Sequence, residues 1–305
     1  MLAPIGLFVY KRPEHTVRVL EGLRSNREAR DSDLFVFSDG AKNSLANEGV
    51  SAVRALVRKL TGFRSVTVVE QSANLGLARS IVTGVTDLTG RFGRVIVLED
   101  DVVPGRHFLH YMNAALEKYE HVREVVSIHG YSYPVNCSLP DTFFLRGADC
   151  WGWATWARGW RVFEPDGAKL LARLSESGLS CVFDFDGGYP YKKMLEEQVA
   201  GRNDSWAIRW YAAAFLDGLL TLYPGSSQVQ NIGTDGSGTH GGCAAEFLHA
   251  SWGKPVLLED IPIQENQRAR EAFVHMLKSL RPSLTRRIWA RLRKITGEIP
   301  KGVKR

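Results

Sequence analysis

The sequence of 305 residues predicts an α/β fold, in which a mostly parallel sheet is flanked by helices. Its first third alternates short apolar runs with segments whose apolar residues recur at helical spacing. The run 94–98 is apolar on both faces, as in a parallel strand that helices cover on each side. Strands that alternate with amphipathic helices form βαβ units, whose crossovers are right-handed.

The elements of the first third follow one another closely. In the helix that begins after Asn74, apolar residues recur at i, i+4, i+8 and i+11 from Leu77, so they share one face. The second strand ends at Ser38-Asp39-Gly40, a typical turn sequence. The predicted strands are 5–9, 34–37, 66–69 and 94–98, and the predicted helices are 15–23, 50–60 and the one after Asn74.

Beyond the fourth strand the patterns are less regular. No internal repeat or linker composition divides the chain, so we expect one body, 1–265, followed by a tail, 266–305. The body has a sheet-rich half, 1–130, and a loop-rich half, 131–265. Further predicted elements are a helix ending near Tyr119, a strand at 125–129, an aromatic and glycine-rich segment at 147–160, a helix at 204–216, a strand at 219–223 and a glycine-rich loop at 231–242.

The net charge of +6 comes from the end of the chain. From Arg281 onward the sequence has nine Lys/Arg and one acid, a net of +8, which leaves about −2 for the rest. The body is therefore not basic, which argues against nucleic-acid binding. On a helix, the tail would be amphipathic and basic, which fits either an interfacial segment on anionic lipid or a last helix packed on the body. The apolar residues of that tail are Leu284, Ile288, Trp289, Leu292 and Ile295.

Cysteine spacing and the N-terminus bear on the compartment. The four cysteines contain no CxxC pair, which excludes a zinc knuckle and gives no disulfide framework, so we expect reduced thiols in a cytoplasmic protein. The apolar run 2–10 has no basic residue before it and is too short to span a bilayer. We therefore expect neither a signal peptide nor a membrane anchor there.

Charged residues follow three of the predicted strands. Arg12 follows the first strand, Asp39 the second and Glu99-Asp100-Asp101 the fourth. Carboxyl ends of parallel strands meet at one edge of the sheet, where open α/β sheets bind ligands. Adjacent carboxylates repel one another unless a cation offsets their charge, and oxygen ligands suit Mg²⁺ or Mn²⁺, which usually bind with a phosphate. We predict a metal–phosphate site; the alternative is a turn, a solvated arginine and an acidic loop.

The order of these motifs resembles the GT-A glycosyltransferases, and within them the N-acetylglucosaminyltransferase I type, whose metal motif is also Glu-Asp-Asp. Further segments resemble that group's aromatic Gly-Trp segment, its Asp-Asp-Trp-x-x-Arg stretch and its closing Ser-His-Gly. The resemblance spans roughly residues 5–242 and implies a GT-A fold. The segments that carry it are Asn74-Leu-Gly76, Val97-Leu-Glu-Asp-Asp101, 147–156, 203–209 and Gly238-Thr-His-Gly241.

The resemblance implies that the half 1–130 binds a nucleotide-sugar donor. Asp101 would bind Mn²⁺ or Mg²⁺ held by the donor diphosphate, and Glu99 and Asp100 would contact the sugar and the ribose. Asp39 and Arg12 would hold the nucleotide, with uracil as the expected base. Arg79 is assigned to the same nucleotide-sugar site.

The resemblance assigns the half 131–265 to the acceptor. Asp204 matches the catalytic base, which deprotonates the acceptor hydroxyl in a single displacement that inverts the anomeric centre. His240 is a candidate metal or phosphate ligand, with an ordinary hydrogen bond in a glycine-rich loop as the alternative. The spacing of the tryptophans fits neither a strand nor a helix, so we expect a stacking platform for a sugar, with packing under the sheet as the alternative. These tryptophans are Trp151, Trp153 and Trp156.

Two features depart from the resembling group. The chain has no predicted N-terminal membrane span, and Asn203 replaces the first acid of the Asp-Asp pair. The donor sugar and the acceptor therefore do not carry over.

Two other motifs point elsewhere. Asp184-Phe185-Asp186 spells the DxD pattern usually quoted for glycosyltransferases, but it lies far beyond the fourth strand, and we expect a turn there. The stretch 236–241 matches GxGxxG, yet a dinucleotide fold needs that motif after its first strand. A dehydrogenase is therefore not favoured.

The sequence thus predicts a metal-dependent, inverting glycosyltransferase that uses Mn²⁺ or Mg²⁺ and a nucleotide-sugar, with a UDP-sugar favoured. Its acceptor would be a glycan or a lipid-linked glycan in surface polysaccharide assembly. We expect it on the cytoplasmic face of the membrane, held there peripherally by its tail. The alternatives are a nucleotidyltransferase acting on sugar phosphates and a non-catalytic nucleotide-sugar-binding protein.

Overall fold

The computed structural model describes residues 1–233 and 252–280. An eight-stranded mixed sheet forms its centre, with the strand order β3-β2-β1-β4-β8-β6-β9-β7. Six of these strands run in one direction, while β7 and β8 run antiparallel to their neighbours. The strands are β1 (Ile5–Val9), β2 (Asp33–Ser38), β3 (Ser65–Glu70), β4 (Arg94–Glu99), β6 (Val125–His129), β7 (Thr142–Arg146), β8 (Trp153–Trp156) and β9 (Leu220–Pro224).

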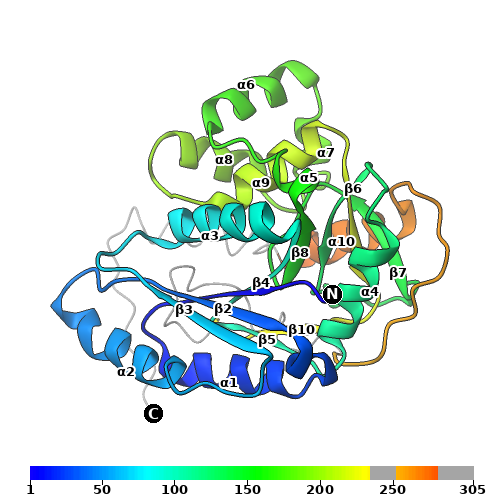
Figure 1. Cartoon of the computed structure of the whole chain (residues 1–305). Helices are drawn as coiled ribbons and strands as arrows, with labels where there is room; N and C mark the ends of the chain where they lie inside the picture. The colour runs from blue at the N-terminus through cyan, green and yellow to red at the C-terminus, as the bar shows by residue number, and fades with distance from the viewer. Residues whose placement is uncertain (234–251, 281–305) are drawn as a thin grey trace, which may run out of the picture.

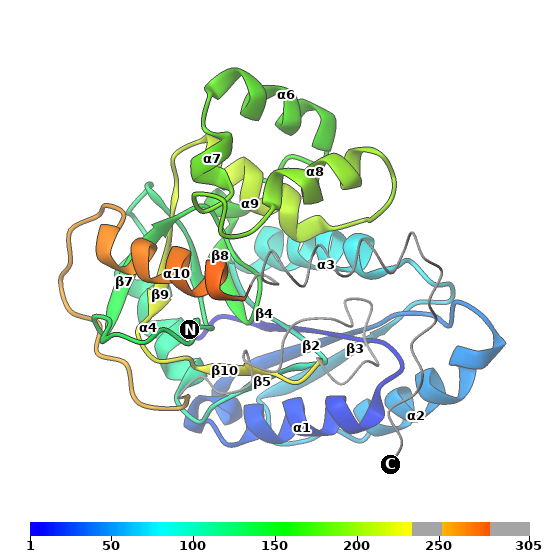
Figure 2. The ribbon, with the colours of Figure 1, turned by 180° about the vertical axis from the view of Figure 1, so that it is seen from behind.

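Helices cover both faces of this sheet. On one side lie α1 and α2, and on the other lies α3, above which α6, α7, α8 and α9 form a helical layer (Figures 1 and 2). Short 3-10 turns occupy Arg27–Asp31 and Ser44–Ala46. The helices are α1 (Pro13–Arg24), α2 (Asn47–Val57), α3 (Leu77–Phe92), α4 (Phe108–Lys118), α5 (Ala157–Trp160), α6 (Gly167–Ser177), α7 (Ser180–Phe183), α8 (Tyr191–Val199), α9 (Trp206–Leu216) and α10 (Gln267–Ser279).

A second, two-stranded sheet lies next to the end of β4. In it, β5 (Val102–Pro104) pairs antiparallel with β10 (Val229–Asn231). The chain therefore returns, late in the sequence, to the segment that follows Glu99-Asp100-Asp101. This return brings Ile232 and Gly233 to the acidic triplet.

The helix α10 packs on the body of the protein. Its residues Ala269, Phe273, Val274 and Leu277 are buried in the same apolar cluster as residues of α6 to α9 and β7. This helix lies inside the segment that the sequence analysis assigned to the tail. The basic stretch 281–305 lies outside the described residues. Of the helices in the described part of the chain, none is long and apolar enough to cross a membrane.

The predicted fold class is confirmed. The strands expected at 5–9 and 125–129 have those bounds, and the helix after Asn74 is α3. The strands β7 and β8 were not expected from the sequence. The tryptophan-rich residues 153–156 form β8, which inserts antiparallel between β4 and β6.

Candidate functional site

The acidic triplet lies where predicted, at the carboxyl end of β4, and Arg12 lies beside it. The Arg12 Nη2 donates to Asp100 Oδ1 and, at 2.8 Å, to Asp101 Oδ2. The Arg12 side chain is 16% exposed, against 6% for Asp100 and 18% for Asp101. The cation that offsets part of the acids' charge is thus supplied by the loop after β1. In this structure Arg12 binds the acids, and the nucleotide contact expected for it stays a prediction.

Burial and mutual repulsion shift the protonation of the acids. Burial, with repulsion from Asp101 and Asp100, raises the pKa of Glu99 to about 8. Burial also raises the pKa of Asp100, although attraction to Arg12 opposes the shift. Burial alone would lower the pKa of Arg12, but attraction to Asp100 and Asp101 raises it above its ordinary value. This shift favours the protonated form of Glu99, which can donate a hydrogen bond.

The carboxylate of Asp39 lies at the end of β2 and accepts hydrogen bonds from the loop before α3. Its Oδ1 accepts from the backbone N–H of Gly40 and Leu75, each at 2.8 Å. Its Oδ2 accepts from Asn74 Nδ2 and from the backbone N–H of Gly76, each at 2.9 Å. Four accepted hydrogen bonds use the acceptor capacity of a carboxylate. Asp39 therefore fastens the end of β2 to the loop before α3, and the nucleotide contact expected for it stays a prediction.

Arg79 lies in the first turn of α3, and its side chain is exposed. The loop that Asp39 fastens leads into this turn, because Gly76 is the residue that precedes α3 and has a φ of 79°. Arg79 is thus accessible at the start of this helix, and the nucleotide-sugar contact expected for it stays a prediction.

The β5–β10 ribbon closes over Asp101. The backbone N–H of Ile232 donates to the backbone carbonyl of Asp101 at 2.8 Å. A Cβ on Gly233 would lie 2.4 Å from Asp101 Oδ2, so a side chain there would displace the carboxylate. Gly233 is needed for this close approach. His240 lies beyond it, outside the described residues, so its predicted ligand role has no structural test here.

The predicted tryptophan platform is corrected in two of its three positions. Trp153 is 1% exposed, and its ring lies 5.4 Å from Trp206 and 6.0 Å from Trp210. Trp156 is 3% exposed and donates from Nε1 to the Leu116 carbonyl. Both rings belong to the core. Trp153 lies in an apolar cluster with residues of α3 and α9, and Trp156 lies in another with residues of α1 and α4. Trp151 is only partly buried and packs edge-on against Tyr131 at 4.8 Å, so it remains the candidate for a stacking contact.

Asp204 lies at the entrance to α9, and its side chain is 76% exposed. Arg209 donates to its Oδ1 at 3.2 Å and also contacts the carbonyls of Ser205 and Pro165. Trp206, two residues further on, stacks on Trp153, which is paired with Val97 of β4. Asp204 is thus tethered to the helical layer near the end of the sheet that bears the acids.

The Asp184-Phe185-Asp186 motif forms a turn, as expected. Phe185 and Asp186 have φ values of 48° and 52°, and Asp184 accepts from the backbone N–H of Lys192. The carboxylate of Asp186 pairs with Arg270 of α10 at 2.6 Å. These contacts tie α7 to α10, which is a structural role.

A carboxylate to which no sequence pattern pointed lies in the loop 147–152, which packs against the end of β4. Asp149 follows β7 and accepts hydrogen bonds from Tyr133 and Tyr223. The one available signal was its position inside the aromatic Gly-Trp segment, since the partners of Asp149 are remote in the sequence.

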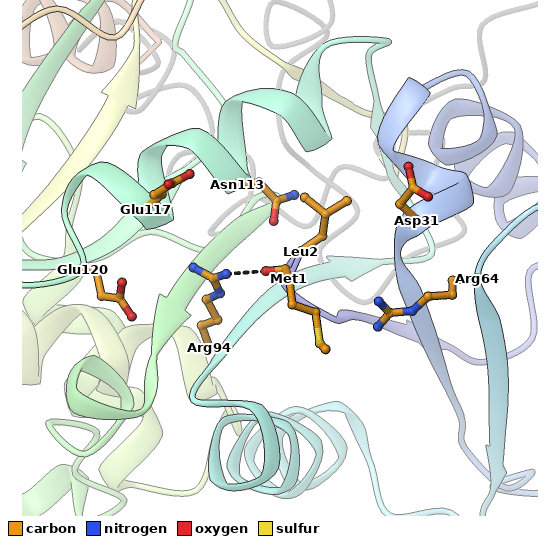
Figure 3. Close-up of a pocket in the computed structure, with 8 residues that line it drawn as sticks. All are labelled: Met1, Leu2, Asp31, Arg64, Arg94, Asn113, Glu117 and Glu120. Carbon is orange, nitrogen blue, oxygen red and sulfur yellow. Dashed lines mark hydrogen bonds between the residues drawn. The ribbon is translucent and has the colours of Figure 1, made fainter.

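A cavity among the described residues lies away from this site. It has a volume of about 440 Å³ and is found at the opposite, amino-terminal edge of the sheet, near the start of β4 (Figure 3). Arg94, at that start, donates to the Met1 carbonyl across it. Its lining carries charges of both signs and none of the predicted site residues. The lining residues are Met1, Leu2, Asp31, Arg64, Arg94, Asn113, Glu117 and Glu120.

The acids suit a metal ion that takes most of its ligands from a substrate. In residues 1–233 and 252–280 no three His, Cys, Asp or Glu side chains converge on one ion. The Oδ1 of Asp101 accepts no hydrogen bond from any described residue, whereas Oδ2 is bound to Arg12. Mg²⁺ commonly binds through one or two carboxylates together with phosphate oxygens and waters. Asp101 fits that arrangement.

Comparisons with known proteins bear on the fold only. Scans against protein-family models and curated proteins find no match. A mannosyltransferase, PcManGT, from Pyrobaculum calidifontis in complex with GDP-Man and Mn²⁺ aligns with a TM-score of 0.34 and 15% identity, over 57% of this chain and 47% of that chain. S. aureus TarS aligns with a TM-score of 0.33 and 10% identity, over 48% of this chain and 25% of that chain. Its fragment 1–349 aligns with a TM-score of 0.40 and 10% identity, over 76% of this chain and 61% of that chain.

This chain spans less than two thirds of the length of each of these solved chains. At these TM-scores the likeness carries no argument about activity. The function therefore rests on the residues of the site itself.

Proposed function

We propose that this protein is a metal-dependent, inverting glycosyltransferase, which moves a sugar from a nucleotide-sugar to a hydroxyl of a glycan or glycolipid. The observation that carries the proposal is the acidic triplet at the carboxyl end of β4, with Arg12 and the β5–β10 ribbon beside it. Carboxyl ends of strands in an open sheet are the general location of ligand sites in α/β proteins.

Donor binding is assigned to the triplet and to Arg79. Asp101 would hold Mn²⁺ or Mg²⁺ together with the donor diphosphate, and a bound ion would neutralise charge on the departing nucleoside diphosphate. Glu99 and Asp100 are assigned to the sugar and ribose hydroxyls. Asp39 is left out of this set because its acceptor positions are filled.

Proton transfer is assigned to Asp204. The acceptor oxygen forms a bond to the anomeric carbon, the bond from that carbon to the diphosphate oxygen breaks, and the hydroxyl proton goes to the Asp204 carboxylate. Its 76% exposed side chain is accessible to an acceptor, and Arg209 limits the directions in which it can point. Attack from the side opposite the diphosphate inverts the anomeric centre.

The setting of the reaction is also a proposal. A UDP-sugar as donor and a lipid-linked acceptor in surface polysaccharide assembly are supported by the motif order and by the basic stretch 281–305. That stretch would hold the protein on the cytoplasmic face of a membrane.

A turnover assay tests the proposed function against its alternatives. The protein is incubated with Mn²⁺ and UDP- or GDP-sugars, with and without a chelator, and the released products are identified. Release of nucleoside diphosphate that the chelator abolishes supports a glycosyltransferase. Pyrophosphate release from a nucleoside triphosphate and a sugar phosphate would support a nucleotidyltransferase, and binding without turnover would support a binding protein.

A further inference from the structure

The loop 147–152, which joins β7 to β8, lies against the end of the strand that carries the acids. A Cβ on Gly152 would lie 3.3 Å from the Leu98 side chain and 2.8 Å from that of Val229. The next residue, Trp153, pairs with Val97, two positions before Glu99. The loop therefore shares one edge of the sheet with the acidic triplet.

The charges of Asp149 and of the triplet act on the same neighbouring residue, Cys150. Burial raises the pKa of the Cys150 thiol, and the charges of Asp149, Glu99 and Asp101 raise it further. Carboxylates of the loop and of the end of β4 therefore both shift the pKa of this one thiol. The geometry agrees, because His129, whose Nε2 lies 3.9 Å from Asp149 Oδ1, pairs with Trp153, the partner of Val97 in β4. We therefore include Asp149 in the candidate site.

Phenol hydroxyls hold the Asp149 carboxylate in a fixed orientation. Tyr133 donates to Oδ2 at 3.2 Å and Tyr223 at 3.5 Å, while the backbone N–H of Cys150 donates to Oδ1 at 2.8 Å. Both tyrosine rings pack against Phe273 of α10, at 5.0 and 5.9 Å. The orienting groups are therefore themselves fixed by the core.

The charge of Asp149 is accessible, and no cationic side chain among residues 1–233 and 252–280 neutralises it. Its side chain is 23% exposed, and no described Lys or Arg pairs with it. His129 Nε2, 3.9 Å from Oδ1, accepts a hydrogen bond from the backbone N–H of Trp151, which identifies this nitrogen as unprotonated. A buried, neutral histidine does not cancel the charge of Asp149.

We propose that Asp149 is a specificity residue, which accepts hydrogen bonds from hydroxyls of the transferred sugar and makes the site select neutral sugars over sugar acids. This inference rests on the proposed function. Hydroxyls are the donors that a preoriented carboxylate binds best among sugar substituents. The negative charge of a sugar carboxylate would be repelled by Asp149 and by the triplet. Among the described residues, Arg12 is the one cation bound to the acids of the triplet.

The test compares the affinity for a nucleotide with that for the nucleotide carrying a sugar. Calorimetric titrations with Mn²⁺ use UDP, UDP-glucose, UDP-N-acetylglucosamine, GDP, GDP-mannose and UDP-glucuronate. The proteins are the full-length wild type, Asp149→Asn and the control Asp217→Asn, whose carboxylate lies after α9 and pairs with Arg173. Asp149→Asn should weaken binding of the best neutral donor about ten- to a hundredfold, with UDP or GDP affinity unchanged. Asp217→Asn should change neither.

Four results would overturn the inference. If Asp149→Asn binds the neutral donor as tightly as the wild type does, Asp149 is not a specificity residue, and the proposed function stays intact. Equal wild-type affinity for UDP-glucuronate and UDP-glucose removes the selection against sugar acids. Unchanged donor affinity with lost turnover would assign Asp149 to proton transfer instead. If wild-type protein binds none of the nucleotide-sugars, the proposed function itself fails, and this inference with it.

A second variant covers the case in which Asp149→Asn does not fold. Tyr133→Phe removes one hydrogen bond to the same carboxylate and keeps the ring that packs on Phe273. It should weaken neutral-donor binding several-fold and raise KM more than it lowers kcat, with UDP or GDP affinity unchanged. An unchanged ratio of sugar-nucleotide to nucleotide affinity would overturn the inference.

Discussion

Arg12 donates a hydrogen bond of 2.8 Å to the carboxylate of Asp101, the residue assigned to the metal. The same nitrogen also binds Asp100, so one guanidinium joins two acids at the end of β4. The site therefore contains a cation of its own before any ligand binds. Binding of a metal–diphosphate at Asp101 has to accommodate or displace this pairing.

Replacing Arg12 by Met should destabilise the fold by about 3–5 kcal/mol, because a largely buried carboxylate pair would lose its partner. Chemical denaturation measures the loss. Arg173→Met is the control: its pair with Asp217 is exposed, and such pairs contribute about 0–1 kcal/mol. Mn²⁺ should recover part of the stability of Arg12→Met, since a bound cation replaces the lost charge. A loss no larger than that of Arg173→Met would contradict the role given to Arg12.

Asp39→Asn should lower stability by about 1–3 kcal/mol, because an amide group cannot accept all the hydrogen bonds that the carboxylate accepts from the loop before α3. Thermal unfolding measures this effect, with the exposed Asp87→Asn as control. The folded variant should bind UDP with nearly wild-type affinity. A large loss of UDP affinity without a loss of stability would restore the nucleotide role first expected of Asp39.

Asp204→Asn should lower kcat by a factor of about 10²–10⁴ and leave donor affinity unchanged, because only proton transfer from the acceptor is removed. Asp217→Asn at the other end of α9 provides the matched control. Steady-state kinetics with a fixed donor and varied acceptor separate the two effects. An active Asp204→Asn variant would place the base elsewhere.

Stability should fall as the pH drops below about 6.5, in part because of His129. Burial lowers the pKa of His129 from its ordinary value of 6.5, against a weaker opposing effect of Asp149. The unfolded chain therefore binds a proton first as the pH falls, and stability is lost from pH 6.5 down to the folded pKa, by at most about 1.4 kcal/mol per pH unit. Denaturation of wild type and His129→Gln between pH 7.5 and 5 measures the difference in slope. His275→Gln, an exposed histidine of α10, should keep the wild-type slope, and equal slopes for all three proteins would contradict this account.

Deletion of residues 281–305 should weaken binding to vesicles that contain anionic lipid, because the deleted stretch carries a net charge of +8. Co-sedimentation with anionic and with neutral vesicles measures this binding. Undiminished binding to anionic vesicles after the deletion would show that the stretch does not hold the protein on a membrane.

The sequence predicted the first half of the fold well because local patterns specify it. The strand 5–9 and the helix after Asn74 have clear apolar periodicity, and both are present. The strand β8 was missed because Trp153 and Trp156 lie on a short strand buried between layers, where alternation gives no signal.

The site was predicted in its position and only partly in its contacts. The chain order placed Arg12 and Asp101 at one edge of the sheet, and that proximity is confirmed. The chain order could not show that the Asp39 carboxylate accepts hydrogen bonds from the backbone N–H groups of Leu75 and Gly76, because such contacts depend on the path of a loop. For the same reason the link between Asp149 and Tyr223, distant along the chain, had no sequence signal.

The pairing of β5 with β10 has a consequence for the order in which the protein folds. The strands β1 to β4 can form from neighbouring segments as soon as they are synthesised. The Asp101 side of the site stays open until Val229–Asn231 arrives, because Ile232 and Gly233 complete it. Contacts between distant segments form slowly, so ligand binding should be acquired late in refolding, after most of the parallel sheet has formed.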